Sequence, residues 1–403
     1  MASAALKRFV HEKIFLGMSL REYVRSNLTI ANGIAAVILV IGVPLFLYRF
    51  YAGLGAVTNL SNSAPWGIWI GFDMMTGIVL AAGGFTIGAT VELFGLKEYH
   101  AIERPAILTA FLGYVIAIVG LLADLGRPWN IVMAIVNAGT ASVLYEVAWC
   151  VMCYSSVLFL EFTVPLFEWL GWQKAYRISK RLLLALTVLS VVFSTMHQSA
   201  LGSLFLLAPT KLHPLWYTPY IFIYFFISAI IAGISMVVVE SSLSHKVFAK
   251  QVEGHDADSL IIGLGKAGAI VTFAYFFLKL QGVIDGHSWG YLKTGYGLWW
   301  MVEVLGFVLL PSLLYAYGAH ERKVAFVRAG GVMGVLGIVV NRLNVSVIAM
   351  NWQLPSAERY VPSWAEIAVS LMLCTVGVLV FRWVVNRFFI LRQNPDPAFA
   401  EAH

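Results

Sequence analysis

Apolar residues occur in long runs along this chain, and polar residues concentrate in the short segments between the runs. A helix needs about 20 mostly apolar residues to cross the hydrocarbon core of a membrane, and the sequence contains ten runs of about that length. The pattern predicts an all-α protein, folded as a polytopic transmembrane bundle of ten helices. The ten runs cover residues 29–51, 67–94, 105–125, 143–168, 182–208, 218–240, 258–282, 297–317, 325–348 and 365–390.

The same pattern defines the domain organisation. We expect a single transmembrane domain at residues 29–390. It would follow an N-terminal segment at residues 1–28 and precede a tail at residues 391–403. Nothing in the first 28 residues has the pattern of a cleaved signal peptide.

Basic residues predict the orientation of the bundle. Of the 27 Lys and Arg residues, 19 lie in the N-terminal segment, in every second loop or at the C-terminal end. The loops on the opposite side hold four, Arg127, Lys211, Lys293 and Arg359. Cytoplasmic loops carry the excess of basic residues in membrane proteins. We therefore expect both termini in the cytoplasm, which agrees with an even number of spans.

Composition excludes the soluble classes of protein. The 403 residues are 60% hydrophobic and 12% charged, whereas about a quarter of the residues in a soluble domain are charged. In a membrane protein the net charge of +6 reflects the basic loops, so we expect a lipid bilayer and no nucleic acid as a partner.

Candidate ligands for a bound redox centre are scarce. Three cysteines cannot form a four-cysteine iron–sulfur site, and Cys150 and Cys153 lie in an apolar run typical of small core residues. A transmembrane haem usually takes two facing histidines, but His197 is the only histidine well inside a span. We expect no haem, no iron–sulfur cluster and no metal site in this chain, so electrons for any redox reaction would come from a partner.

A weak internal echo indicates a possible parallel repeat. Gly67-Ile68-Trp69 followed by Asp73 is similar to Gly297-Leu298-Trp299 followed by Glu303, and Glu146 begins the fourth span as Glu366 begins the tenth.

Ionisable residues inside the spans form two groups by depth. A charged group in a membrane costs several kcal/mol, so each is a candidate functional residue. The alternatives are a structural ion pair or a side chain that reaches the membrane surface from a span end. The outer group comprises Asp73, Asp124, Glu146, His197, Glu303, Arg342 and Glu366, and the cytoplasmic group comprises Glu92, Glu161 and Glu240.

His197 is the most specific candidate in the outer group. It lies in the polar stretch Ser194-Thr195-Met196-His197-Gln198-Ser199, which is typical of a segment that lines a cavity. Its imidazole could donate a hydrogen bond to a carbonyl oxygen and exchange a proton near neutral pH. The alternative is a histidine that serves packing only.

Arg342 is too deep to remain without a counter-charge. A buried guanidinium favours a carboxylate partner, and Asp73, Asp124 and Glu146 have suitable depths. Asp124 and Arg127 could instead form a salt bridge at the end of the third span.

Two further acids have roles that the sequence leaves open. Glu146 lies between Tyr145 and Trp149, where it could bind a flat polar ring and supply protons, or pair with Arg342. Glu240 ends the sixth span, where it could take protons from the cytoplasm or simply reach the membrane surface.

Several of these motifs together resemble the NrfD/polysulfide reductase membrane-anchor family, and within it the membrane subunits of hydrogenase-2-type complexes. The likeness runs from about residue 45 to 390 and is looser in the second half, around Asn341-Arg342. The motifs are Pro65-Trp66-Gly67-Ile68-Trp69-Ile70 with Phe72-Asp73, Ala82-Gly83-Gly84, Asp124-x-Gly126-Arg127-x-Trp129-Asn130, Leu144-Tyr145-Glu146, Thr195-Met196-His197-Gln198-Ser199 with Gly202-Ser203, Lys211-x-His213-Pro214-Leu215-Trp216 and Glu240-x-Ser242-Leu243.

The resemblance implies a haem-free, quinone-reactive anchor in the bacterial cytoplasmic (inner) membrane. In such a complex a periplasmic [NiFe] hydrogenase, with large and small subunits, splits hydrogen. A ferredoxin-like iron–sulfur subunit with four clusters passes the electrons on, and the membrane subunit reduces quinone, with menaquinone as the expected substrate. The functional residues of the family carry over to Glu146, His197 and Glu240 of this sequence.

We therefore expect a quinone site near the outer face and a proton supply from the cytoplasm. His197 would bind a quinone carbonyl, and Glu146, Glu161 and Glu240 would conduct protons. The other residues expected to shape the quinone site are Asp73, Asp124, Arg342, Tyr145 and Trp69. The alternatives are an anchor for a polysulfide, nitrite or tetrathionate enzyme, or a proton-coupled secondary transporter.

Overall fold

The computed structural model describes residues 7, 9–137, 139, 141–249, 251, 257–392 and 399. Within these residues, ten helical segments are long and apolar enough to cross a membrane, which confirms the ten predicted spans. Part of the N-terminal segment at 1–28 and most of the tail at 391–403 lie outside the described residues. The spans run over Ile30–Ala52, Trp69–Leu93, Lys97–Asp124, Val143–Leu170, Gln173–Leu207, Ile221–Val247, Asp258–Asp285, Gly295–His320, Val324–Ile348 and Trp364–Val385.

Seven spans consist mainly of one α-helix. These helices are α3 (Ile30–Ala52), α6 (His100–Asp124), α8 (Val143–Leu170), α9 (Gln173–Ser203), α10 (Ile221–Val247), α11 (Ala257–Asp285) and α15 (Trp364–Val385). A short helix, α2 (Leu20–Asn27), precedes them, and a capping box formed by Ser19 and Glu22 begins it. The helix α15 begins with a second capping box, formed by Ser363 and Glu366. In both, side chains satisfy backbone N–H groups that the first helical turn leaves free.

The other three spans change helix type along their length. The second span comprises η3 (Trp69–Thr76), α4 (Gly77–Leu80), α5 (Gly83–Gly88) and η4 (Ala89–Leu93). The eighth comprises α12 (Gly295–Met301), η9 (Val302–Leu309) and α13 (Leu310–His320), and the ninth comprises α14 (Val324–Leu343) and η10 (Asn344–Ile348). The segments η3, η4, η9 and η10 are π-helical, and π-helical turns often occur at functional sites.

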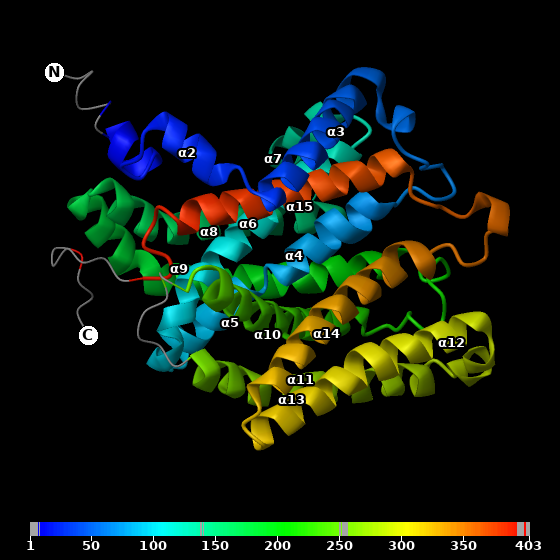
Figure 1. Cartoon of the computed structure of the whole chain (residues 1–403). Coiled ribbons are helices and arrows are strands. Elements are labelled where there is room, and N and C mark those ends of the chain that lie inside the picture. Colours follow the sequence, from blue (N-terminus) through cyan, green and yellow to red (C-terminus); the bar gives the residue numbers. More distant parts are fainter. Residues whose placement is uncertain are drawn as a thin grey trace.

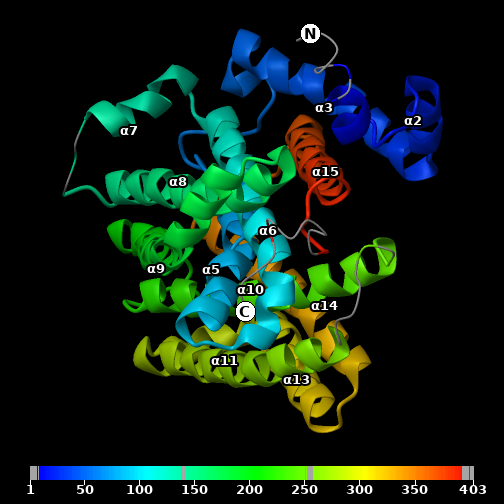
Figure 2. The ribbon, with the colours of Figure 1, turned by 90° about the vertical axis from the view of Figure 1, so that its left-hand side faces the viewer.

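Eight of the spans pack as two groups of four. The first group is formed by the second span with α6, α8 and α9, and the second group by α10 with α11, α13 and α14. The helix α10 also packs on α9 and α5, so it joins the groups. Figure 1 shows the spans running side by side, and Figure 2 views them end on, with α3 and α15 together on one side and α11 and α13 on the opposite side.

Glycines permit close contact where the groups meet. A Cβ atom on Gly233 of α10 would lie 2.9 Å from the backbone oxygen of Ala82, and one on Gly83 would lie 2.9 Å from Val237 Cγ2. The backbones of α10 and the second span therefore approach each other more closely than larger side chains would allow.

The predicted repeat does not superimpose one group on the other. The echoed residues Asp73 and Glu303 both lie on π-helical segments, η3 and η9. However, α15, which carries Glu366, packs on α3 and α6 rather than within the second group. The parallel repeat stays a prediction.

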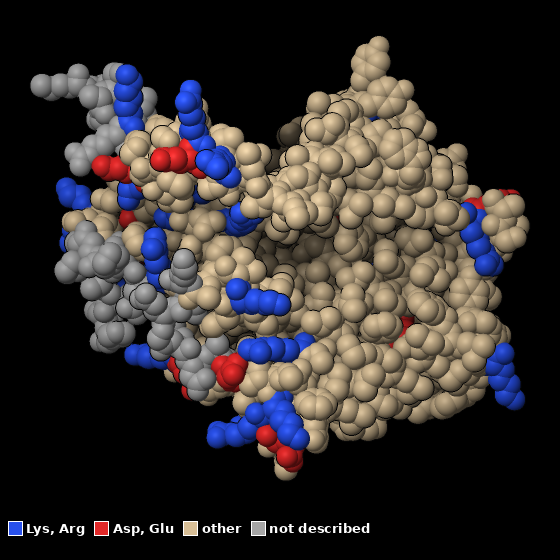
Figure 3. Space-filling model, viewed as in Figure 1, with Lys and Arg blue, Asp and Glu red and all other residues tan. Residues whose placement is uncertain are grey.

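Charged side chains gather at one end of the bundle. Figure 3 shows most of the visible Lys and Arg side chains at the end where α2 lies, with a broad uncharged surface beside it. We call this the basic end and the opposite end the outer end. Phe9, before α2, contacts Trp169, which stacks on Phe388 after α15, so the two ends of the described chain meet at the basic end. That the basic end faces the cytoplasm stays a prediction.

Candidate functional site

His197 lies fully buried on α9, within the first group of helices. Neither of its ring nitrogens makes a hydrogen bond of ordinary geometry in the described part of the protein, although the ring lies close enough to the Val147 backbone to interact with it. The imidazole faces the ring of Tyr114 on α6 edge to face, with 5.7 Å between the ring centres, and Tyr114 packs in the same way on Tyr154 of α8 at 4.7 Å.

Further polar atoms around His197 are buried and have few hydrogen-bond partners. The hydroxyls of Tyr114 and Ser194 and the Oε1 atom of Gln198 are buried and make no hydrogen bond of ordinary geometry within the described residues. The Tyr154 hydroxyl is also buried, and it lies close enough to Ser190, Ser194 and the Phe85 backbone to interact with them. A buried polar group without a partner costs about 1–3 kcal/mol. This concentration of hydrogen-bonding capacity suits a polar ligand that both donates and accepts. We call these five residues the His197 cluster.

A line of hydroxyls extends from the His197 cluster toward the basic end. Thr187, Ser190 and Ser194 precede His197 on α9 at helical spacing and are all buried. Ser190 donates a hydrogen bond of 3.3 Å to Glu161 Oε2 on α8. Because α9 rises about 1.5 Å per residue, the line covers about 15 Å from Thr187 to His197.

Glu161 lies beside a cavity on the side of the basic end. It lines this open cavity together with Glu92, Lys97, Glu103 and Lys180, residues next to the loops after the second and fourth spans. The cavity gives water access to Glu161, although this side chain is only 4% exposed.

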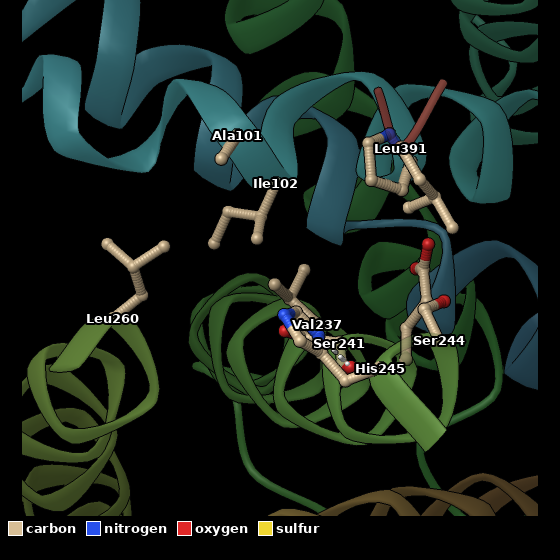
Figure 4. Close-up of a pocket in the computed structure, with 10 residues that line it drawn as sticks. Ala101, Ile102, Val237, Ser241, Ser244, His245, Leu260 and Leu391 are labelled. Carbon is tan, nitrogen blue, oxygen red and sulfur yellow. Dashed lines mark hydrogen bonds between the residues drawn. The ribbon is translucent and has the colours of Figure 1, made fainter. Parts of the chain in front are cut away.

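Glu240 lies in a separate position on α10. It accepts a hydrogen bond of 2.8 Å from Thr109 Oγ1 of α6, and its Oε1 atom has no partner among the described residues. It lines a smaller cavity with Ser241, Ser244 and His245 (Figure 4). Thus Glu161 and Glu240, expected to share one proton path, open onto two different cavities.

The outer acids form a second polar group nearer the outer end. Asp73 is 2% exposed and accepts a 2.6 Å hydrogen bond from Ser370 on α15, while Asp124 is close enough to interact electrostatically with Asp73, Arg49 and Glu366. Arg49 donates to the backbone oxygens of Ala123 and Leu125 at the end of α6.

The contacts of Glu366 connect the start of α15 to neighbouring segments. It accepts hydrogen bonds from the backbone of Asn59 at 3.1 Å and of Ser363 at 2.8 Å and from the Tyr360 hydroxyl at 2.5 Å. It therefore fixes the start of α15 against the loop after α3.

Arg342 does not pair with any of the expected carboxylates. It donates to Asn341 Oδ1 and Ser228 Oγ, both at 2.8 Å, and its guanidinium stacks on the Phe225 ring at 3.9 Å. Arg342 belongs to the second group of helices, whereas Asp73 packs against α6 and α15 and Asp124 lies at the end of α6 near Arg49 and Glu366. The expected Asp124–Arg127 salt bridge is likewise wrong, since Arg127 is exposed and pairs with no acid in the described structure.

Glu146, Tyr145 and Trp69 do not converge on His197 at hydrogen-bond distance. Glu146 is exposed at the start of α8, and Tyr145 bonds with the indole N–H of Trp149. Trp69 is 1% exposed and donates a 3.1 Å hydrogen bond to the Glu366 backbone oxygen. Their expected roles in binding quinone stay predictions.

Sequence reasoning missed the tyrosines and serines of the first group. Tyr114, Tyr154 and Ser190 lie in apolar runs, where each by itself is unremarkable. The available signal was the spacing of Thr187, Ser190, Ser194 and His197, which places all four on one face of a helix.

The described residues contain no group of three or more His, Cys, Asp or Glu side chains that could hold a metal ion. Of the three free cysteines, Cys150 is buried and Cys153 partly buried.

The chain is similar to one protein family and to several individual proteins. The family described as "Polysulphide reductase, NrfD" matches residues 56–351. A protein of Nitratidesulfovibrio vulgaris, described only as "Protein", is 48% identical over 94% of this chain and 98% of its own length. The probable Ni/Fe-hydrogenase 2 b-type cytochrome subunit of Escherichia coli is 29% identical over 89% and 92% of the two chains. The menaquinone reductase integral membrane subunit of N. vulgaris is 26% identical over 83% and 85%.

Proposed function

Because this chain belongs to the NrfD family of membrane subunits of oxidoreductase complexes, we propose that it binds quinone within its first group of helices and passes electrons from an iron–sulfur partner to it. The observation that carries the proposal is the His197 cluster, a buried set of side chains in which several polar atoms make no hydrogen bond of ordinary geometry among the described residues. The relationship to a menaquinone reductase subunit supports menaquinone as the substrate.

The chemistry of quinone reduction suits this cluster. A quinone takes up two electrons and two protons to become a quinol, so its carbonyl oxygens need hydrogen-bond donors that can be resupplied with protons. His197 would donate to one carbonyl oxygen, and the Tyr114 and Tyr154 hydroxyls would orient the ring. Asp73 packs against Gly120 of α6. Gly120 lies six residues after Tyr114, so Asp73 lies about 9 Å nearer the outer end than Tyr114 does.

The proposal remains haem-free. The relative from E. coli is named a b-type cytochrome subunit, but a transmembrane haem usually takes two facing histidines. In the described structure the ring that packs edge to face against His197 is that of Tyr114.

Protons for the reaction would come from the basic end. The line of hydroxyls from Glu161 to His197 supports a path from the larger cavity, with Ser190 as the first step. Glu240 would serve as a second entry, in contact with Thr109 of α6. Uptake from the cytoplasm would make the reaction electrogenic, whereas uptake from the outer side would be electroneutral.

The proton path is tested in liposomes that contain the purified complex. Proton uptake and quinone reduction are measured for the native protein, Glu161→Gln and Glu240→Gln. Glutamine keeps the hydrogen bonds but cannot carry a proton, so we expect Glu161→Gln to slow both processes at least fivefold. Unchanged proton translocation in Glu240→Gln would exclude the route through Glu240.

For the electron donor, we propose a periplasmic [NiFe] hydrogenase with its large and small subunits and a four-cluster ferredoxin-like subunit, as the hydrogenase relative suggests. Affinity purification of the native complex, followed by absorption spectroscopy and hydrogen-dependent menaquinone reduction, tests this. A polysulfide, nitrite or tetrathionate enzyme as the partner would reject the hydrogenase but keep the quinone site. A colourless protein that purifies alone and transports solutes would reject both.

A further inference from the structure

The helix α2 and the first and tenth spans enclose a groove that the proposed quinone reduction does not use. It lies at the basic end, where α3 begins and α15 ends, and it is lined by both helices, by α2 and by the segment before α2. Figure 2 shows α2, α3 and α15 together at one edge of the bundle. We call it the α2 groove.

The polarity of the α2 groove changes in the same direction along both spans. The two helices run in opposite directions, since Arg382 near the end of α15 donates to Asn32 near the start of α3. On α3, Leu39 lies two turns after Asn32, about 10 Å farther from the basic end. On α15, Leu379 lies almost one turn farther from the basic end than Arg382 does. The groove is therefore polar at the basic end and apolar deeper in the bundle, which suits an amphipathic ligand.

Two arginines at the polar end of the groove have no acid as a partner. Arg382 donates to Asn32 Oδ1 at 2.8 Å. Arg387 donates to the Ile14 backbone oxygen at 2.7 Å and to the Tyr23 hydroxyl at 2.8 Å. Neither arginine forms an ion pair with a carboxylate in the described part of the chain. The groove therefore carries two positive charges whose contacts are all with neutral groups.

The contacts of the two arginines explain Arg387 but not Arg382. Arg387 is 6% exposed and fixes the segment before α2 against the end of α15, which is a structural role. Arg382 is partly exposed, and its single side-chain hydrogen bond within the described residues leaves its other N–H groups free to bind an anion. The acid of α2, Glu22, is held in the capping box with Ser19. Because a guanidinium can bind a phosphate through two parallel hydrogen bonds, Arg382 is suited to a phosphate group.

The exposed side chains of α2 indicate that the groove opens among lipid headgroups. Leu20 and Val24 lie one turn apart on α2, Leu28 follows directly after the helix, and all three are exposed. Arg21 and Arg25 are exposed as well. A helix that combines an exposed apolar face with basic residues lies in the interface between membrane and water. The polar end of the α2 groove is then at the depth of the phosphate groups of one leaflet.

The apolar end of the groove continues onto a surface that faces lipid. Gly42 and Arg49 are the buried residues of α3, so most of this helix is covered by neither group of spans. Ile34 and Val37, which are close to the groove along α3, are exposed. A hydrocarbon chain that leaves the groove therefore meets apolar side chains and the bilayer.

We propose that the α2 groove binds one anionic phospholipid. Its phosphate diester accepts hydrogen bonds from Arg382, and Arg387 adds a second positive charge near the headgroup. One acyl chain lies along Ala36, Leu39 and Leu379 and continues into the bilayer. The bound lipid connects α2 to the first and tenth spans. A free phosphate would leave the apolar half of the groove without a ligand.

The proposal is tested by native mass spectrometry of the full chain, purified in detergent and titrated with lipid. The two probes are phosphatidylglycerol and phosphatidylcholine with the same acyl chains. Both contain a phosphate diester, but the ammonium group of phosphatidylcholine cancels its charge. We expect one phosphatidylglycerol to bind at least fivefold more tightly than phosphatidylcholine. Inorganic phosphate should not displace it.

Two variants assign the binding to the groove. A basic residue beside an anionic lipid changes its affinity about fivefold, so we expect Arg382→Gln to weaken phosphatidylglycerol binding by about that factor. The matched control is Arg177→Gln, an exposed position on α9 that lies outside the groove. It removes the same charge and should bind the lipid as the native chain does. Ala36→Phe, at an exposed position, fills the apolar part of the groove and should weaken binding at least fivefold with both arginines in place.

Each outcome decides the proposal. Equal affinity of the native chain for the two lipids would overturn it, as would unchanged phosphatidylglycerol binding in Arg382→Gln. Displacement by inorganic phosphate would show a site for a free anion instead of a lipid. If Arg382→Gln does not fold, Ala36→Phe gives the answer by itself, since native affinity in that variant would place the lipid outside the groove. None of these results depends on quinone reduction, so failure here leaves the proposed function as it stands.

Discussion

At the scale of single residues, the proposed quinone site predicts that the rate of quinone reduction depends on a hydrogen-bond donor at His197. His197→Phe keeps an aromatic ring beside Tyr114 but removes both nitrogens. Loss of one hydrogen bond in a buried site costs about 1–3 kcal/mol, so we expect quinone reduction to slow by about 5- to 150-fold. His197→Gln, which keeps a donor, should recover part of the rate. The measurement is quinone reduction by purified complex of unchanged thermal stability.

The exposed residue His320 provides the control for this prediction. His320→Gln should reduce quinone at the native rate. Equal rates for His197→Phe and the native complex would place the quinone elsewhere.

His213 gives a prediction for pH, because it lies outside the spans in the loop before α10. Its ring stacks on Tyr296 with 4.7 Å between ring centres and is 1% exposed. Burial lowers the pKa of His213 to about 4, below the ordinary 6.5. Unfolded chains therefore bind a proton here first as the pH falls from 6.5 toward 4, so the stability of the folded protein falls across that window.

A matched substitution isolates the contribution of His213. His213→Asn can still accept the backbone hydrogen bond from Leu215 that Nδ1 accepts at 3.2 Å, but it does not titrate. We expect its thermal unfolding midpoint to depend less on pH between 6.5 and 4, by a few degrees, than that of the native protein. Identical pH profiles would mean that His213 is not protonated on unfolding.

The sequence identified buried ionisable residues but not their partners. Depth along a span follows from residue number, so Asp73, Glu161 and Arg342 were placed at the right level. Which face of a helix meets which neighbour depends on packing among all ten spans. For that reason the pairing of Arg342 with Asn341 and Ser228, rather than with an acid, could not be predicted.

At the scale of helices, the packing of α10 against the second span depends on glycines, which have no side chain to hold the two helices apart. In Gly233→Ala the new Cβ atom would lie 2.9 Å from the Ala82 carbonyl. Overpacking of this kind costs about 1–3 kcal/mol, so we expect a lower thermal unfolding midpoint in detergent. Gly33→Ala, on the exposed face of α3 with no atom near its Cβ, should not lower it. A Gly233→Ala protein as stable as the native one would show that the helices can separate slightly at no cost.

The existence of the helices could be predicted far better than their internal form. Ten apolar runs gave ten spans, most with ends within a few residues of those predicted. The third and fifth spans begin earlier than expected, at Lys97 and Gln173, and the tenth ends earlier, at Val385. Pro105 therefore lies inside α6 rather than in its first turn. The sixth span continues to Val247, so Glu240 lies about two turns inside it rather than at its end. The π-helical segments could not be predicted, because a run of apolar residues does not distinguish a π-helical turn from an α-helical one.

At the scale of the whole molecule, the two groups of helices divide the chemistry between them. The first carries the His197 cluster with the proposed path from Glu161, and the second carries Arg342 and the buried ion pair of Lys279 with Glu303. Because α10 contacts both groups, a change of charge at one can act on the other through a single helix. In the proposed function a partner delivers the electrons, and that partner would bind at the outer end, where the candidate quinone site lies.

That assignment depends on the outer end facing the periplasm, which the distribution of basic residues predicts. Gly290→Cys at the outer end and Glu321→Cys at the basic end place single thiols on exposed loops that flank the eighth span. The background carries Cys374→Ser, since Cys374 is exposed on α15. In intact spheroplasts a membrane-impermeant maleimide should label position 290 but not 321, and both should react after permeabilisation. The reverse pattern would place the His197 cluster on the cytoplasmic side, so a cytoplasmic partner would have to supply its electrons.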